Sequence, residues 1–347
     1  MLLNGDFVAV DHGGSLDRAR KLFPAAPEPW VDLSTGINPH SYPLFDLPAT
    51  AFTRLPEPSR HRELCAIAAG AYGAPGAQNV AAAPGTQVLL PRAAALVKPS
   101  RARILGPTYA EHARAAAFAG HEVQEVSDFG DLEGADLAVV VNPNNPDGRI
   151  VPRRDLLDLA RAMRGRGGLL VVDEAFMDVG PAAESLCGDA AEEGLLVLRS
   201  FGKFFGLAGV RLGFAIGAEP VVRRLDAELG PWCVPGPALE YGCRALADRE
   251  WQDAMRARLA QDVGRLDALL DSVGVRVTGG TILYRHIWMA EAASLFASLG
   301  QEGIIMRRFA ERPEVLRSGL PADEIGWTRL ESALRRWASG NSRGAES

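Results

Sequence analysis

Short apolar runs alternate with amphipathic segments between about residue 60 and residue 217. Several runs are continuously apolar, which is typical of strands that are buried on both faces of a parallel sheet. Segments such as 86–97 and 152–166 carry apolar residues at helical spacing and lie between the runs. This alternation predicts a large domain built on a mostly parallel, doubly wound α/β sheet. Its strands are expected at 79–85, 102–107, 121–126, 137–143, 168–176, 195–202 and 211–217.

The pattern changes after residue 235. Residues 237–273 repeat Leu and Ala at three- and four-residue spacing with charges between them, which predicts long amphipathic helix. Residues 274–287 and 303–309 predict strands, and residues 321–339 predict a closing helix. This part therefore has the pattern of a smaller α+β domain.

The first 45 residues lack a regular pattern. Residues 1–30 include the proline-rich stretch FPAAPEPW and predict an arm, and residues 32–43 predict a loop. We therefore divide the chain into four parts. They are an arm with the start of the small domain (1–45), the large domain (46–235), the small C-terminal domain (236–340) and a disordered tail (341–347).

Composition and charge narrow the class of protein. The chain has 347 residues, 47% hydrophobic and 23% charged, as expected of a globular protein with two domains. A net charge of −6 argues against nucleic acid as a partner. The start of the sequence lacks the basic segment and apolar run of a signal peptide, and no apolar stretch approaches the ~18 residues of a membrane helix, so we expect a cytoplasmic protein without membrane partners. Cys65, Cys187, Cys233 and Cys243 lack zinc-like spacing, so we expect reduced thiols and no metal site.

Polar residues stand at the ends of several predicted strands, where open α/β sheets bind their ligands. Gly85, Thr86 and Gln87 join a strand to a helix and could hold a phosphate on backbone N–H groups, although an ordinary helix cap by Thr86 is an alternative. In VNPNNPDG, two X–Pro units form a rigid loop that could present Asn145 as a hydrogen-bond donor, or a plain turn.

Two further strand ends carry charges. Asp173 ends an apolar strand and needs a partner there, such as a protonated pyridine nitrogen or an arginine; a metal is less favoured, and a helix cap is the structural alternative. Lys203 follows another strand among apolar neighbours, which would lower the pKa of its amine and make it a nucleophile. Asn145, Asp173 and Lys203 are separated by 28 and 30 residues, one strand–helix unit each.

As a set, these motifs resemble the fold-type I pyridoxal-phosphate enzymes of the class I/II aminotransferase superfamily. The superfamily pattern Asn-Pro-x-Gly, Asp-Glu-Ala-Tyr and Ser-x-x-Lys-x-x-Gly-x-x-Gly-x-Arg is matched by NPDG, DEAF and SFGKFFGLAGVR. The resemblance extends over nearly the whole chain. It implies pyridoxal 5'-phosphate as the cofactor and a homodimer as the assembly.

The resemblance also implies roles for single residues. Lys203 would bind the cofactor covalently and move protons, Asp173 would keep the pyridine nitrogen protonated, and Asn145 would bind the ring hydroxyl. Tyr109, in GPTYAEH, would stack on the ring. The cofactor phosphate would be held by Gly85, Thr86, Gln87, Ser200 and Arg211.

Some positions depart from the superfamily pattern. Phe176, which we also expect at the cofactor, stands where a tyrosine usually reaches the ring hydroxyl, so that hydrogen bond is lost. Gly202 replaces a serine that usually donates to the phosphate. Leu55 replaces a tyrosine of the histidinol-phosphate aminotransferases.

Within the superfamily, the N-terminal stretch DHGGSLDRARKLF…WVDLSTGINPHSYP resembles that of the threonine-phosphate decarboxylases of cobalamin biosynthesis. Those enzymes convert L-threonine O-3-phosphate into (R)-1-amino-2-propanol O-2-phosphate. Histidinol-phosphate aminotransferases are the alternative. Either resemblance implies a small phosphorylated amino-acid-like substrate, and the positions that match substrate-binding residues are His12, Asn38, Arg307 and Arg317. Arg308 beside Arg307 leaves an ambiguity, because neighbours on a strand face opposite ways, and we choose Arg307.

Other classes fit the sequence less well. A non-catalytic relative would be expected to lose Lys203 or Asp173, and the chain keeps both. A Rossmann dehydrogenase would show G-x-G-x-x-G after its first strand, and the chain has no such motif there.

Overall fold

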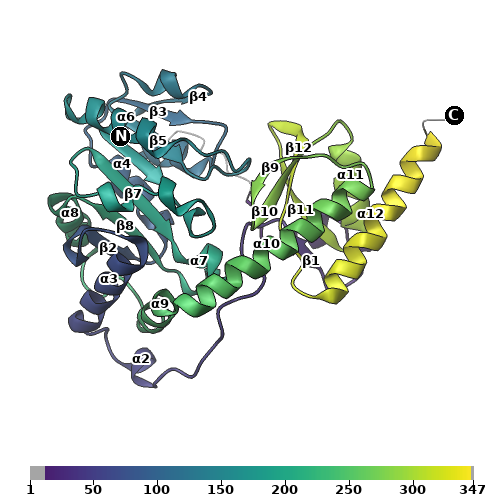
Figure 1. Cartoon of the computed structure of the whole chain (residues 1–347), viewed down its shortest axis with the longest axis horizontal. Coiled ribbons are helices and arrows are strands. Elements are labelled where there is room, and N and C mark those ends of the chain that lie inside the picture. The colour runs from purple at the N-terminus through teal and green to yellow at the C-terminus, as the bar shows by residue number, and fades with distance from the viewer. Residues whose placement is uncertain (1–11, 345–347) are drawn as a thin grey trace. The chain divides into compact units, whose positions relative to one another are not determined.

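The computed structural model describes residues 12–344, with side chains as far as residue 340. This part of the chain divides into two compact units (Figure 1). The large unit comprises Ile37–Arg265 and Gly279–Arg285, and the small unit comprises the remaining described residues. Each unit has its own sheet.

The sheet of the large unit contains, among the described residues, seven strands in the order β2-β8-β7-β6-β5-β3-β4. The neighbours β3/β4, β3/β5, β5/β6 and β6/β7 are parallel, whereas β8 is antiparallel to β2 and to β7. A mostly parallel sheet is therefore confirmed, with a strand at each predicted position. The strands are β2 Val80–Ala83, β3 Arg101–Leu105, β4 Glu122–Val126, β5 Leu137–Val141, β6 Leu169–Asp173, β7 Leu195–Ser200 and β8 Gly213–Gly217.

The central strands β5, β6 and β7 are buried at every position, which explains their continuously apolar sequences. The helices of this unit are α2 Thr50–Thr53, α3 Pro58–Tyr72, α4 Leu90–Ala94, α5 Glu111–Phe118, α6 Arg153–Arg164, α7 Phe201–Phe204, α8 Glu219–Leu229, α9 Gly236–Ala247 and the first part of α10 Arg249–Ser272. The helix expected over 86–97 is shorter, because a 3₁₀ turn at Thr86–Val88 precedes α4.

The predicted helix over 237–273 is two helices. It breaks at Asp248, whose Oδ1 accepts a hydrogen bond of 3.0 Å from the Trp251 N–H and so caps α10. The first of the two, α9, packs on α3, and a side chain at Gly242 would meet Leu64 at 2.7 Å. The large unit consequently extends past the predicted boundary at residue 235, as far as Arg265, and it also includes Gly279–Arg285.

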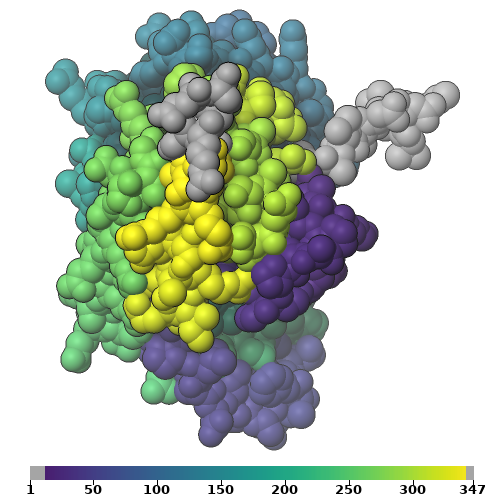
Figure 2. Space-filling view, turned by 90° about the vertical axis from the view of Figure 1, so that its right-hand side faces the viewer, coloured from purple at the N-terminus to yellow at the C-terminus, as the bar shows by residue number. Residues whose placement is uncertain are grey.

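The second sheet contains, within residues 12–344, five strands in the order β1-β11-β12-β10-β9. They are β1 Val31–Leu33, β9 Val277–Thr281, β10 Tyr284–Trp288, β11 Ile304–Phe309 and β12 Arg312–Ser318. The accompanying helices are α1 Leu16–Leu22, α11 Ala292–Gln301 and α12 Glu324–Gly344. α12 packs on α11 and presents its other side at the surface (Figure 2).

The N- and C-terminal predictions need correction. Residues 16–22 form a helix rather than an arm, because the Ser15 hydroxyl accepts from the Arg18 N–H at 3.4 Å and caps it. Residues 31–33 form a strand parallel to β11 rather than part of a loop. The tail predicted to be disordered is helical as far as Gly344, and residues 1–11 and 345–347 lie outside the described residues.

Candidate active site

A cavity of about 160 Å³ lies where β5, β6 and β7 of the large unit end. Val141, Asp173 and Ser200, the last residues of these strands, line it. The residues predicted to bind the cofactor all line it as well: Gly85, Thr86, Gln87, Tyr109, Asn145, Asp173, Phe176, Ser200, Lys203 and Arg211. Ala175, Gly202, Ala208 and Leu212 complete the wall and were not predicted as site residues.

One wall of the cavity is a cradle for an anion. Gly85 has φ +92°, and a β-carbon there would lie 2.6 Å from an Arg211 guanidinium nitrogen. A β-carbon on Gly213, in β8, would lie 2.6 Å from the Thr86 nitrogen. The absence of side chains at these glycines lets the loop amides, Ser200 and Arg211 come together. N–H donors, a hydroxyl and a guanidinium suit a phosphate group.

Asp173, at the end of β6, is 5% exposed. Its Oδ2 lies 2.8 Å from Nε2 of His112, and its Oδ1 accepts a hydrogen bond of 3.0 Å from the Ala175 N–H. Sequence reasoning missed His112. No local pattern signals it, because its contact with Asp173 bridges 61 residues of sequence.

The asparagine-rich loop after β5 is held by two of its own side chains. Asn142 exchanges hydrogen bonds with the Val151 backbone, donating at 3.1 Å and accepting at 2.9 Å. Asn144 accepts from the Thr108 hydroxyl at 2.7 Å and donates to the Pro107 carbonyl at 3.0 Å. These bonds explain why the loop contains several asparagines, and they hold Asn145 at the cavity wall.

Lys203 lies in α7, directly after β7. Its Nζ is 5.9 Å from the centroid of the Phe176 ring, which in turn packs edge-on against Tyr284 at 5.1 Å. A β-carbon on Gly202 would lie 2.9 Å from the Ala208 α-carbon, so a serine does not fit there without a shift. Asn38 donates from its backbone to the Lys203 carbonyl at 3.0 Å.

The side chain of Asn38 also serves the backbone. Its Nδ2 donates to the Phe204 carbonyl at 2.8 Å, and its Oδ1 accepts from the His40 N–H at 2.8 Å. These bonds tie the 38–40 segment to the helix that carries Lys203. A contact between Asn38 and substrate stays a prediction.

The remaining predicted substrate residues belong to the small unit. Arg307 of β11 and Arg317 of β12 are directly opposite each other in the antiparallel pair, so their side chains leave the sheet on the same face. Arg317 is buried and donates to the Ser34 carbonyl at 2.9 Å. The guanidinium of Arg308 lies over the Phe296 ring, at 5.0 Å, and that of Arg307 over the Phe309 ring, at 5.2 Å.

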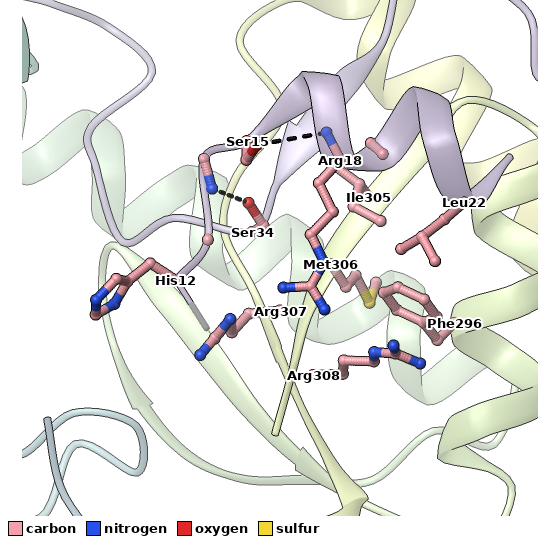
Figure 3. A pocket seen from close by; sticks show the side chains of 13 residues that line it. His12, Ser15, Arg18, Leu22, Ser34, Phe296, Ile305, Met306, Arg307 and Arg308 are labelled. Atoms are coloured by element: carbon pink, nitrogen blue, oxygen red, sulfur yellow. Dashed lines mark hydrogen bonds between the residues drawn. The ribbon is translucent and has the colours of Figure 1, made fainter. Parts of the chain in front are cut away.

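His12, Arg307 and Arg308 line a smaller cavity of about 40 Å³ in the same unit. Figure 3 shows Arg18, from α1, and Arg307, from β11, extending into this cavity. Burial, followed by the charge of Arg18, lowers the pKa of Arg307. Arg18 was not predicted as a site residue because α1 itself was missed. The convergence of these cations suits a small anionic group.

In the part of the chain that the structure describes, no cluster of three His, Cys, Asp or Glu residues could hold a metal ion. The same residues form no helix that is both long and apolar enough to cross a membrane.

Comparisons with known proteins bear on this site. Residues 52–324 match the family model described as aminotransferase class I and II. A threonine-phosphate decarboxylase from Pseudomonas aeruginosa is 42% identical over 94% of this chain and 97% of its own. A threonine-phosphate decarboxylase from Sinorhizobium is also 42% identical, over 94% of this chain and 98% of its own. A histidinol-phosphate aminotransferase from Cronobacter sakazakii is 30% identical over 80% and 82%.

Solved structures share the fold at lower sequence identity. A histidinol-phosphate aminotransferase from Clostridium acetobutylicum has a TM-score of 0.77 and 20% identity, covering 89% of this chain and 99% of its own. An L-threonine-O-3-phosphate decarboxylase from Porphyromonas gingivalis has a TM-score of 0.74 and 20% identity, with 88% and 99% covered. Together with the family match over most of its length, these findings show that the chain belongs to the aminotransferase class I and II family.

Proposed function

We propose that the protein is a pyridoxal-5'-phosphate-dependent decarboxylase that converts L-threonine O-3-phosphate into (R)-1-amino-2-propanol O-2-phosphate, a step of cobalamin biosynthesis. The observation that carries the proposal is 42% identity over 94% of the chain to proteins described as threonine-phosphate decarboxylases. The cavity of the large unit supports it, because an amine, a buried carboxylate, an aromatic ring and an anion cradle line one space.

The lining residues fit the proposed cofactor. When bound, pyridoxal phosphate withdraws electrons from the α-carbon of an amino-acid substrate. The Lys203 amine would hold the cofactor covalently, and Asp173, fixed by His112, would stabilise a protonated ring nitrogen. Asn145 would bind the ring hydroxyl. The backbone amides after Gly85, together with Ser200 and Arg211, would bind the phosphate.

Decarboxylation replaces carbon dioxide at the α-carbon by a proton, and the Lys203 ammonium group delivers that proton. We assign Arg307 and Arg317, with His12, to binding the anionic groups of the substrate. Their hold on its phosphate would determine whether the carboxylate or the α-hydrogen of the substrate is lost.

The enzyme is further proposed to act as a cytoplasmic homodimer. Its four cysteines are free thiols, as is usual in a reducing compartment. Large apolar side chains of the large unit, among them Leu44, Phe52 and Leu55, are exposed and would be covered in a dimer.

The first experiment is to incubate the protein and pyridoxal phosphate with L-threonine O-3-phosphate, without any keto acid, and to detect aminopropanol phosphate by mass spectrometry. Lys203→Ala should reduce the rate about 10²–10⁴-fold or more, as expected for loss of a catalytic proton-transfer group. Exposed Lys98→Ala is the matched control.

A second candidate, histidinol-phosphate aminotransferase, rests on the 30% identity to the Cronobacter sakazakii protein. If wild-type protein forms no aminopropanol phosphate but transfers the amino group of histidinol phosphate to 2-oxoglutarate, this candidate replaces the first.

A further inference from the structure

Three side chains beside the cavity form a chain of hydrogen bonds. The Tyr109 hydroxyl donates to Gln87 Oε1 at 3.2 Å, and Gln87 Nε2 donates to Glu111 Oε2 at 2.8 Å. Glu111 is 6% exposed and lies in the first turn of α5, where its other oxygen is 3.4 Å from Arg114. Gln87 and Tyr109 line the cavity, whereas Glu111 stands behind them.

The chemistry of these groups fixes the direction of each bond. An ionised carboxylate only accepts hydrogen bonds, so the NH₂ end of the Gln87 amide must face Glu111. The carbonyl end of the same amide then faces Tyr109. A carbonyl also only accepts, so the Tyr109 hydroxyl must donate its proton to Gln87. The carboxylate thereby determines the role of a hydroxyl that lies on the cavity wall.

We propose that Glu111 is a positioning residue that locks the Gln87 amide and, through it, the hydroxyl and ring of Tyr109. This inference rests on the proposed function of the cavity and adds to it. Tyr109 serves as a fixed aromatic wall and not as a proton donor to the substrate. The side chain of Gln87 is engaged in these hydrogen bonds with Tyr109 and Glu111, which leaves its backbone N–H for the cofactor phosphate.

The charges around Tyr109 agree with this arrangement. Burial, followed by the negative charges of Glu111 and Asp173, raises the pKa of Tyr109 to about 12, although Arg211 lowers it. Loss of the Glu111 charge should lower that pKa. Release of the Gln87 amide should lower it further, because a flipped amide would donate to the tyrosinate.

The test uses Glu111→Gln, which keeps the size of the side chain and removes its charge. Tyrosinate absorbance is followed after a rapid pH jump in cofactor-free protein. The signal of Tyr109 is isolated by subtracting the trace of each protein's Tyr109→Phe counterpart.

Wild-type Tyr109 should ionise near pH 12, and in Glu111→Gln it should ionise at a clearly lower pH. Glu122→Gln, an exposed carboxylate on β4, is the matched control and should titrate as wild type. Identical titration of wild type and Glu111→Gln overturns the proposal.

A second measurement reports on the cavity. Glu111→Gln should raise the dissociation constant of pyridoxal phosphate about tenfold, the effect of one lost hydrogen bond, and the same substitution should have little effect in a Tyr109→Phe background. If Glu111→Gln weakened cofactor binding equally in the wild-type and Tyr109→Phe backgrounds, Glu111 would not act through Tyr109. The tyrosine titration needs neither cofactor nor turnover, so failure of the proposed reaction and failure of this inference give different results.

Discussion

Gly213 shows how little space separates the two sides of the phosphate cradle. A β-carbon there would meet the Thr86 nitrogen at 2.6 Å and the Gly85 carbonyl carbon at 2.9 Å, both of them backbone atoms. Gly213→Ala must therefore displace the loop whose N–H groups are proposed to bind the phosphate. We expect the cofactor dissociation constant, measured by fluorescence titration of cofactor-free protein, to rise about tenfold or more.

Gly70→Ala is the control for this substitution. Gly70 lies in α3, and no atom comes within 4 Å of an added β-carbon. This variant should keep the wild-type affinity and gain up to ~1 kcal/mol of stability, because alanine favours helix. Unchanged cofactor affinity in Gly213→Ala would show that the loop amides do not bind the phosphate.

Arg307 and Arg308 are adjacent and provide a matched pair. Arg307→Ala should raise the KM for L-threonine O-3-phosphate about 10–100-fold, since a hydrogen bond from a charged group contributes ~1.5–3 kcal/mol. Arg308→Ala should have a much smaller effect, because this side chain is exposed whereas Arg307 is half-buried, although both line the same cavity. Steady-state kinetics of both variants measure the difference, and equal effects would contradict the assignment of Arg307 to substrate.

At the residue scale, the sequence was sufficient to find a residue of the candidate site where a polar side chain stood at the end of an apolar strand. Asn145, Asp173 and Lys203 could be found in this way because parallel strands bring their carboxyl ends to one edge of the sheet. His112 and Glu111 could not, since their importance depends on which neighbours the helix α5 meets. Their contacts to Asp173 and Gln87 bridge 61 and 24 residues of sequence.

At the scale of elements, a buried ion network connects the ends of β6 and β7. Arg199 donates to Glu174 at 2.9 Å and to Asp178 at 2.7 Å, and the three side chains are at most 7% exposed. Burial by itself would lower the pKa of Arg199, but charges that include Asp178 and Glu174 outweigh it and raise that pKa. The network adjoins Asp173 on one strand and Ser200 on the other, so it holds these ends in place.

Removal of the cation should leave two buried carboxylates without a balancing positive charge, although Glu174 keeps hydrogen bonds from Ser185 and Leu186. We expect Arg199→Leu to lower the free energy of unfolding by about 3–5 kcal/mol, measured by urea denaturation. Arg161→Leu, which breaks half-exposed pairs of α6, should cost less than ~1 kcal/mol. A similar, small loss in both variants would mean that the buried network does not stabilise the fold.

Among the strands of the large sheet, β5, β6 and β7 were found because burial on both faces selects continuously apolar residues. β4 was found although it is mostly exposed. β1 was missed because it has three residues and depends on pairing with β11, where Val31 lies opposite Ile304. β12 was missed as well; its first half is exposed or half-buried and includes a proline, so it lacks an apolar run. Such strands form because they pair with segments distant in sequence, and the local pattern of apolar residues does not show this pairing.

At the scale of the whole molecule, exposed apolar residues are unevenly distributed along the chain. Leu44, Phe52 and Leu55 fall within one short segment of the large unit and are 75%, 68% and 64% exposed. Phe118 is similarly exposed, at 72%, but stands alone on α5. Single exposed apolar residues are common on monomers, whereas several in one segment indicate a covered surface.

This distribution predicts where the proposed dimer forms. The wild-type protein should have the mass of a dimer in size-exclusion chromatography with light scattering. Phe52→Glu should shift it toward the monomer, because a charge replaces an apolar side chain that would otherwise be buried, at a cost of several kcal/mol. Phe118→Glu should remain dimeric. A monomeric wild type would refute the homodimer, and dissociation by Phe118→Glu but not by Phe52→Glu would place the interface on α5 instead of the 44–55 segment.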